Sequence, residues 1–243
     1  MKTNTNKKLL KMMVLAMLVA LGVIISPILR VEGMCPMAHF INIVCAVFLG
    51  PYYALACATL IGVLRMTFMG IPPLALTGAI FGAYLSGLFY RMSKGNLLMA
   101  VLGEIIGTGI IGAIVSYPVM SLLWGKEGLT MFFYVPSFVC GTLIGGSIAF
   151  AFLKKLSSAG ALTRFQTMLG SQSYDDESGV IGNAVSIAAI GVIIFVVINI
   201  VKDMFQINAP AMPYITYGVL GVFILAALVY MAVRGLRRKT NDN

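Results

Sequence analysis

The stretch from Cys35 to Arg65 reads CPMAHFINIVCAVFLGPYYALACATLIGVLR and is almost wholly apolar. One continuous helix over this stretch would be about 45 Å long, well beyond a hydrocarbon core of about 30 Å. Gly50-Pro51 lies in the middle, and proline cannot continue a helix and disfavours helical geometry in the residue before it. We therefore predict two antiparallel membrane helices, one on each side of this break, with the second ending near Met69.

Three polar residues interrupt this apolar stretch. His39 is the only histidine of the chain, Asn42 follows it one helical turn later, and Arg65 lies near the end. A polar group in hydrocarbon costs several kcal/mol unless it is paired, so such residues face a bundle interior or a binding cavity. We interpret them as the mark of a binding site.

The composition of the chain is that of a polytopic membrane protein. Of its 243 residues, 60% are hydrophobic and only 10% are charged, and the mean hydropathy is +0.97. These values predict an all-α membrane bundle without a separate soluble domain. The net charge of +9 would suggest nucleic-acid binding in a soluble protein, but basic residues on one side of a membrane explain it better here. The four cysteines form no C-x-x-C pair, so we expect neither a metal nor another cofactor.

A basic segment precedes the first apolar run, which extends from Met12 to Leu29. No small-residue cleavage site follows the run, so a retained helix is a better interpretation than a signal peptide. Ala16 and Ala20 lie one turn apart on this helix, a spacing that lets another helix approach closely. The other predicted helices cover residues 74–90, 97–117, 131–153, 181–201 and 214–233.

The distribution of basic residues predicts eight crossings with both termini inside. Under this arrangement the inner side receives 13 of the 17 basic residues, as the positive-inside rule requires. They are Lys2, Lys7, Lys8, Lys11, Arg91, Lys94, Lys154, Lys155, Arg164, Arg234, Arg237, Arg238 and Lys239. Merging the two helices around Gly50-Pro51 would scramble every later loop.

The predicted helix over 97–117 adds further polar candidates. Glu104 is the only carboxylate inside an apolar run, and Thr108 lies one turn above it. Counting about 1.5 Å per residue places Glu104 about 10 Å deeper than Asn42 and Arg65. Tyr117 and Trp124 are expected at the outer surface. Two roles stay open for Glu104 and Arg65: they contact a ligand, or they neutralise one another inside the bundle.

Four runs of the sequence resemble the ThiW family, over residues 9–155. They are AMLVALGV (16–23), CPMAHFINIVCAVFLGPYYA (35–54), L-R-x-x-x-x-G (64–70) and LGEIIGTGIIGAIVSYPV (102–119). Members of this family are substrate-binding (S) components of energy-coupling factor (ECF) transporters, associated with uptake of the thiazole precursor of thiamin. The resemblance implies a six-helix domain over 9–156 in a bacterial plasma membrane. Residues 157–180 are expected as a polar cytoplasmic linker and 181–235 as an additional two-helix hairpin.

The resemblance also implies partners and a site. Small residues placed like Ala16 and Ala20 contact a shared transmembrane (T) subunit in S components, and two cytoplasmic ATPases act through that subunit. The expected ligand is hydroxyethylthiazole, a related precursor or thiamin. The site residues that we expect from their polarity and their depth in the apolar runs are His39, Asn42, Arg65, Glu104, Thr108, Tyr117 and Trp124.

Two other functional classes remain to be weighed against an S component. A self-sufficient secondary transporter would need ion coupling, but the halves show no repeat and the apolar runs hold one carboxylate. An intramembrane enzyme is disfavoured because the sequence has no H-E-x-x-H, no paired aspartates and no serine–histidine pair. The sequence also lacks a G-x-x-x-x-G-K-[ST] phosphate loop, so any use of ATP must come from partner subunits.

Overall fold

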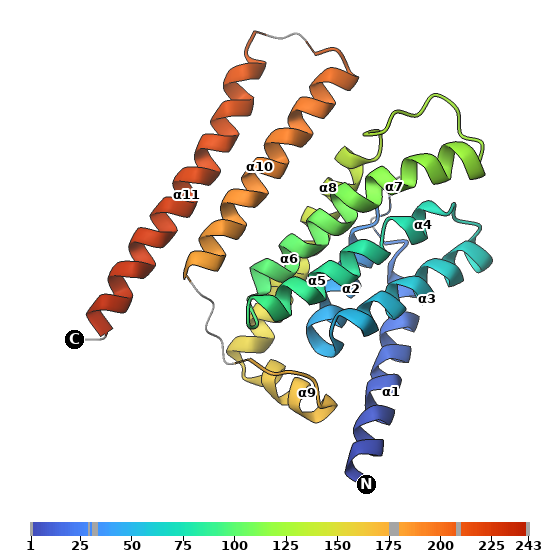
Figure 1. Cartoon of the computed structure of the whole chain (residues 1–243), viewed down its shortest axis with the longest axis vertical. Coiled ribbons are helices and arrows are strands. Elements are labelled where there is room, and N and C mark those ends of the chain that lie inside the picture. The colour runs from blue at the N-terminus through green and yellow to red at the C-terminus, as the bar shows by residue number, and fades with distance from the viewer. Residues whose placement is uncertain (1, 29, 31–33, 175–179, 208–209, 242–243) are drawn as a thin grey trace. The chain divides into compact units, whose positions relative to one another are not determined.

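The computed structural model describes residues 2–28, 30, 34–174, 180–207 and 210–241, and all regular structure in these ranges is helical (Figure 1). The prediction of an all-α protein is therefore confirmed. The chain divides into two compact units, Met1–Glu177 and Ser178–Asn243. The first runs from α1 (Lys2–Ile25) to α9 (Ala161–Leu169), and the second holds α10 (Val180–Met204) and α11 (Met212–Asn241).

Helix α2 (Pro36–Leu49) is the central helix of the first unit. It buries residues on every face, as expected of a helix that is apolar all round. With 14 residues it is only about 21 Å long, which suits a helix enclosed by protein rather than by lipid. Its neighbours are α1, α3 (Pro51–Met69), α5 (Ile80–Met92), α6 (Leu97–Glu104), α8 (Val135–Ser158) and α9.

The predicted break at Gly50-Pro51 is confirmed. Helix α2 ends at Leu49, and Pro51 is the first residue of α3. Gly50 has a φ of +95°, and a Cβ atom there would lie 2.9 Å from the Cζ atom of Arg91. The turn therefore requires glycine for both its backbone conformation and its close packing.

Helix α5 packs against α6 and its continuation η1 (Ile105–Gly112) through glycines on both sides. A Cβ atom on Gly107 would lie 2.5 Å from the Cα atom of Gly82, and one on Gly112 would lie 2.8 Å from the carbonyl oxygen of Gly78. Small residues at this spacing allow such a close approach. The contact brings the polar side chains of α6 and η1 directly against α5.

The structure divides one predicted helix and extends another, and it shifts the ends of several more. The segment predicted as one helix over 74–90 is divided into α4 (Leu74–Thr77) and α5, with Gly78 and Ala79 between them. The helix predicted to end at Tyr117 continues through α7 (Ala113–Pro118) into η2 (Val119–Leu123). Both η segments are π-helical, and Pro118, the last residue of α7, does not end the helix because the chain continues directly into η2.

The expected polar linker contains a packed helix. Helix α9 lies within residues 157–180 and contacts α1, α2 and α8. Its Gln166 is 1% exposed and donates hydrogen bonds from Nε2 to the carbonyl oxygen of Val47 at 2.9 Å and to the hydroxyl of Tyr90 at 3.0 Å. Buried amides need such partners, so α9 is attached to the bundle by specific contacts.

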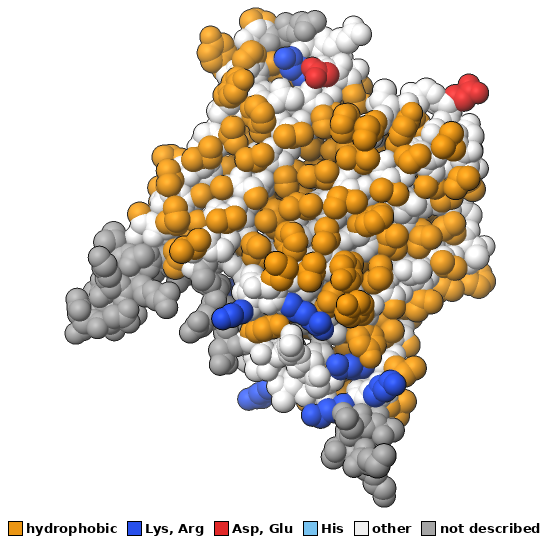
Figure 2. Space-filling model, in the orientation of Figure 1, with side chains coloured by type: hydrophobic (Ala, Val, Ile, Leu, Met, Phe, Trp, Pro, Cys, Tyr) orange, Lys and Arg blue, Asp and Glu red, His pale blue; other side chains and the backbone are white. Residues whose placement is uncertain are grey.

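Six helices in the described ranges are long and apolar enough to cross a membrane. They begin at Asn6, Pro51, Leu97, Val135, Val180 and Met212. Helix α2 and the pair α4–α5 are shorter, so the count of eight crossings stays a prediction. Figure 2 shows that lysine and arginine side chains gather at the end of the first unit where α1 begins. This grouping suits the predicted inner position of that end, and the orientation also stays a prediction.

The second unit is a helical hairpin. Gly191 of α10 packs against Phe223 of α11, where a Cβ atom would lie 2.8 Å from the Cγ atom of the ring. Asn183 donates a hydrogen bond from Nδ2 to the hydroxyl of Tyr230 at 2.7 Å. The two helices are therefore joined by both apolar and polar contacts.

Candidate functional site

A cavity of about 440 Å³ lies in the first unit, at the ends of α2 and α3 away from the Gly50-Pro51 turn. Small-molecule sites in proteins have volumes of about 300–1,000 Å³. The cavity walls come from α2, α3, the segment 71–79, η1, η2 and the segment 124–138. Its described polar lining residues are Arg30, His39, Arg65, Thr108, Trp124, Lys126 and Tyr134.

One wall of the cavity is aromatic. Tyr134 and Phe138 lie one turn apart at the start of α8, with ring centroids 5.8 Å from each other. Both side chains are nearly buried, at 3% and 5% exposed. Met120 from η2 and Ile71 add apolar surface to the same cavity. A flat aromatic ligand would bury its ring against such a wall.

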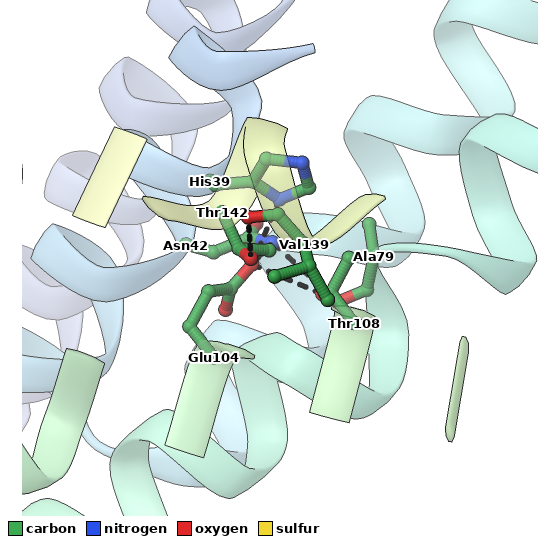
Figure 3. A network of polar contacts seen from close by, with 7 residues as sticks. All are labelled: His39, Asn42, Ala79, Glu104, Thr108, Val139 and Thr142. Carbon is green, nitrogen blue, oxygen red and sulfur yellow. Dashed lines mark hydrogen bonds and ion pairs between the residues drawn. The ribbon is translucent and has the colours of Figure 1, made fainter. Parts of the chain in front are cut away.

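Beneath the cavity lies a polar network centred on Glu104 (Figure 3). Its Oε1 atom lies 2.9 Å from Nδ1 of His39 and accepts hydrogen bonds from Nδ2 of Asn42 at 3.0 Å and from the hydroxyl of Thr108 at 3.1 Å. Glu104 is 0% exposed. Three donors on one oxygen compensate for the loss of hydration that the buried carboxylate suffers.

The second oxygen of Glu104, Oε2, has no hydrogen-bond partner within the part of the chain that the structure describes. It lies against Gly82 of α5, where a Cβ atom would come within 2.8 Å of it. Glycine at this position therefore makes room for the carboxylate.

The network fixes the orientation of His39. A carboxylate oxygen can only accept, so Nδ1 carries the proton that is shared with Glu104. His39 also lines the cavity, and its Nε2 atom has no partner among the described residues. Nε2 therefore accepts a hydrogen bond when the ring is neutral and donates one when the ring is protonated. In both states the Nδ1–H bond to Glu104 is kept.

Arg65 stands apart from this network. It is 4% exposed and lines the cavity, and its Nε atom has no hydrogen-bond partner among the described residues. The interpretation in which Glu104 and Arg65 neutralise one another is wrong, because the described residues hold only one ion pair of Glu104, with His39. Gly70 ends α3 in a left-handed conformation and places Arg65 in its last turns.

The predicted site residues fall into three groups. Four of them line the cavity: His39, Arg65, Thr108 and Trp124. Asn42 and Glu104 lie in the network beneath and do not line it. The depth in the membrane that we predicted for Glu104 from the helical rise per residue is wrong. Its carboxylate lies within hydrogen-bond distance of Asn42 rather than about 10 Å deeper. Tyr117 is half-buried in α7 and does not line the cavity.

Ala16 and Ala20 are exposed on α1 of the first unit. Leu18 and Val19, on the other side of α1, are buried against the bundle. The small-residue face is therefore open to a neighbour, and its function as a partner interface stays a prediction.

Sequence reasoning missed the aromatic wall and the mouth of the cavity. Tyr134 and Phe138 are spaced by four residues, which places them on one helical face and is the signal that could have found them. Arg30 belongs to the loop before α2, and Lys126 belongs to the loop between η2 and α8. Both residues line the cavity. Nothing local in the sequence indicates that these loops meet.

Long apolar helices around a cavity of about 440 Å³, lined by aromatic and a few polar groups, suit a membrane protein that binds small molecules. The family comparison agrees with this class. The model of the ThiW family, described as "Thiamine-precursor transporter protein (ThiW)", matches residues 12–159, and the chain belongs to this family. No curated protein and no solved structure matched the chain. The matched segment contains the whole cavity, while α10 and α11 lie beyond it.

Proposed function

We propose that this protein is the substrate-binding subunit of an ECF-type importer and that it captures a thiazole precursor of thiamin from outside the cell. The cavity carries this proposal: its aromatic wall suits a small heterocycle, and Nε2 of His39 offers a hydrogen bond to a ligand hydroxyl. Hydroxyethylthiazole has both features. A bacterial plasma membrane is the proposed location.

The site requires no chemistry beyond binding and release. In the neutral state of His39, Nε2 accepts from the ligand hydroxyl while Nδ1–H donates to Glu104, which keeps the ring oriented. Thr108 joins the cavity to the same carboxylate. Asn42 acts through Glu104 and positions it without contacting the ligand.

The proposed partners are a T subunit and, through it, two ATPases. The sequence has no phosphate loop of its own, so ATP-driven release would require these subunits. The exposed small-residue face of Ala16 and Ala20 is the proposed contact with the T subunit. Replacing both alanines with leucine should abolish uptake and leave ligand affinity unchanged, because the change fills the face but lies outside the cavity. Loss of affinity in the purified double variant would contradict this assignment.

The decisive experiment compares binding with transport. The purified protein should bind hydroxyethylthiazole in calorimetry and should not bind biotin, an unrelated vitamin. In proteoliposomes, uptake should require the T and ATPase subunits together with ATP. Binding of thiamin alone would keep the S-component role and change the substrate. A failure to bind any thiamin-pathway compound would contradict the proposed substrate class.

A secondary transporter is the second candidate, and the buried contact between His39 and Glu104 favours it. Buried ionisable pairs within membranes serve as proton sites in pumps and carriers. This function predicts uptake by the protein alone, driven by a proton gradient. Uptake that is absent without the ATPase subunits and insensitive to an ionophore would exclude it.

A further inference from the structure

We infer that the cavity prefers a thiamin precursor that carries an oxyanion, a phosphate monoester or a carboxylate, and that Arg65 binds this group. The inference rests on the proposed function and names the chemical form of its ligand. Its starting point is a buried cation for which the described residues supply no counter-ion.

Arg65 is buried and has no ion-pair partner among the described residues. The side chain is 4% exposed, its Nε atom is buried without a hydrogen-bond partner, and no described carboxylate lies within ion-pair distance. No described aromatic ring stacks on it either, since the only cation–π contact recorded among these residues joins Lys11 to Tyr53. A guanidinium carries five N–H donors and stays charged in proteins, so burying it unpaired is unfavourable.

The charge of the cavity lining also favours an anionic ligand. Two arginines, Arg30 and Arg65, line the cavity, and its described lining includes no carboxylate. Glu104 does not line the cavity: it is fully buried, and its Oε1 atom accepts three hydrogen bonds from its own chain. A cavity with low-dielectric walls and one sign of charge attracts a ligand of the opposite sign.

An oxyanion matches the hydrogen-bond donors of the cavity better than a hydroxyl does. A guanidinium binds carboxylate and phosphate through two parallel hydrogen bonds, which a hydroxyl cannot accept in the same way. His39 adds a donor at Nε2 when it is protonated, and Glu104 keeps the ring in place in that state as well. With about 440 Å³ the cavity exceeds the needs of a single substituted ring and leaves room for the oxyanion.

The test measures the affinity of the purified full chain for three related compounds by calorimetry. They are hydroxyethylthiazole, its phosphate monoester, and the thiazole acetic acid in which a carboxylate replaces the alcohol. One oxyanion or both should bind about 10- to 150-fold more tightly than the alcohol, the range expected for a charge-assisted hydrogen-bonded contact. Inorganic phosphate alone should bind weakly, because the aromatic wall then contributes nothing.

Two variants connect this preference to the buried arginine. Arg65→Met should lower affinity for the oxyanions at least about 10-fold more than it lowers affinity for the alcohol. Arg30→Gln removes the same charge at an exposed position of the same cavity, so it should lower the preference by no more than a few-fold, and less at high salt. Without ligand, Arg65→Met should melt no earlier than the wild type, because it removes an unpaired buried charge.

The outcomes separate the two proposals. Tight binding of the alcohol with no gain from either oxyanion would overturn this inference and leave the proposed function intact. No binding of any thiazole would contradict the proposed function itself. Glu32 is a carboxylate that lies outside the described residues. The variant Glu32→Gln therefore serves as a further control for a counter-ion of Arg65. A large gain in oxyanion affinity in that variant would show that Glu32 pairs with Arg65 in the free protein, which would also overturn the inference.

Discussion

Replacing Glu104 with glutamine should destabilise the bundle, because a fully buried carboxylate accepts three hydrogen bonds on one oxygen. Hydrogen bonds to a charged group contribute about 1.5–3 kcal/mol and neutral ones about 0.5–1.5 kcal/mol. The substitution therefore weakens each of the three bonds by about 1 kcal/mol or slightly more. Bonds that share one group are not additive, so we expect a loss of about 2–4 kcal/mol in the free energy of unfolding.

The position of the new amide adds to this loss. The NH2 group of glutamine would occupy the place of Oε2, next to Gly82, where no described residue forms a hydrogen bond with that oxygen. A buried donor without a partner is costly. Affinity for the thiazole should fall as well, because the neutral amide holds the His39 ring less firmly.

The measurement is thermal unfolding of the ligand-free protein in detergent, followed by helical circular dichroism. A loss of 2–4 kcal/mol lowers the Tm of a domain of this size by about 4–16 °C. Glu127→Gln is the matched control, since Glu127 is exposed and the same charge is lost. If both variants melt at the wild-type temperature, the carboxylate does not hold the network together and our reasoning about it is refuted.

Three further predictions follow from the packing and the cavity. Gly82→Ala should destabilise the first unit, because its Cβ would lie 2.8 Å from the Cδ atom of Glu104, whereas Gly218→Ala meets nothing within 4 Å and should not. Deleting residues 178–243 should leave a folded bundle that binds ligand. A longer deletion that also removes α9 should lower the Tm of this bundle. Equal Tm values of the two truncated proteins would show that α9 does not contribute to stability. Trp124, the only tryptophan, lines the cavity at 53% exposed, so its emission should change saturably with hydroxyethylthiazole and not with biotin. Flat emission alongside calorimetric binding would place the ligand away from that loop.

Features that depend on local chemistry were predictable from the sequence. Proline after glycine cannot continue a helix, so the break at Gly50-Pro51 was visible without a structure. Polar residues in apolar runs are conspicuous because their burial is costly, which is why His39, Arg65 and Thr108 were predicted as site residues, and all three line the cavity. The exact number of crossings did not follow, because an enclosed helix such as α2 can be shorter than the hydrocarbon core.

Features that depend on which helices meet were not predictable. His39 and Glu104 are 65 residues apart, and the contact between them follows from the glycine packing of α5 with η1 and from α2 lying against α6. The count of depth assumed straight helices of constant rise, whereas the chain contains π segments and a divided helix at Gly78. Gln166 looked like part of a polar linker because its partners, a carbonyl and a hydroxyl, belong to distant helices.

The two buried charges of the site have opposite relations to the protein. The carboxylate of Glu104 is satisfied by donors of its own chain, so it stabilises the bundle whether or not a ligand is present. The Nε atom of Arg65 has no partner among the described residues and the side chain lines the cavity, so its burial costs free energy that an anionic ligand would offset. Removing the first charge should therefore lower the stability of the empty protein, and removing the second should lower the stabilisation that an anionic ligand provides. If instead Arg65→Met destabilises the empty protein as much as Glu104→Gln does, both charges are structural and the cavity recognises its ligand by the aromatic wall and His39 alone.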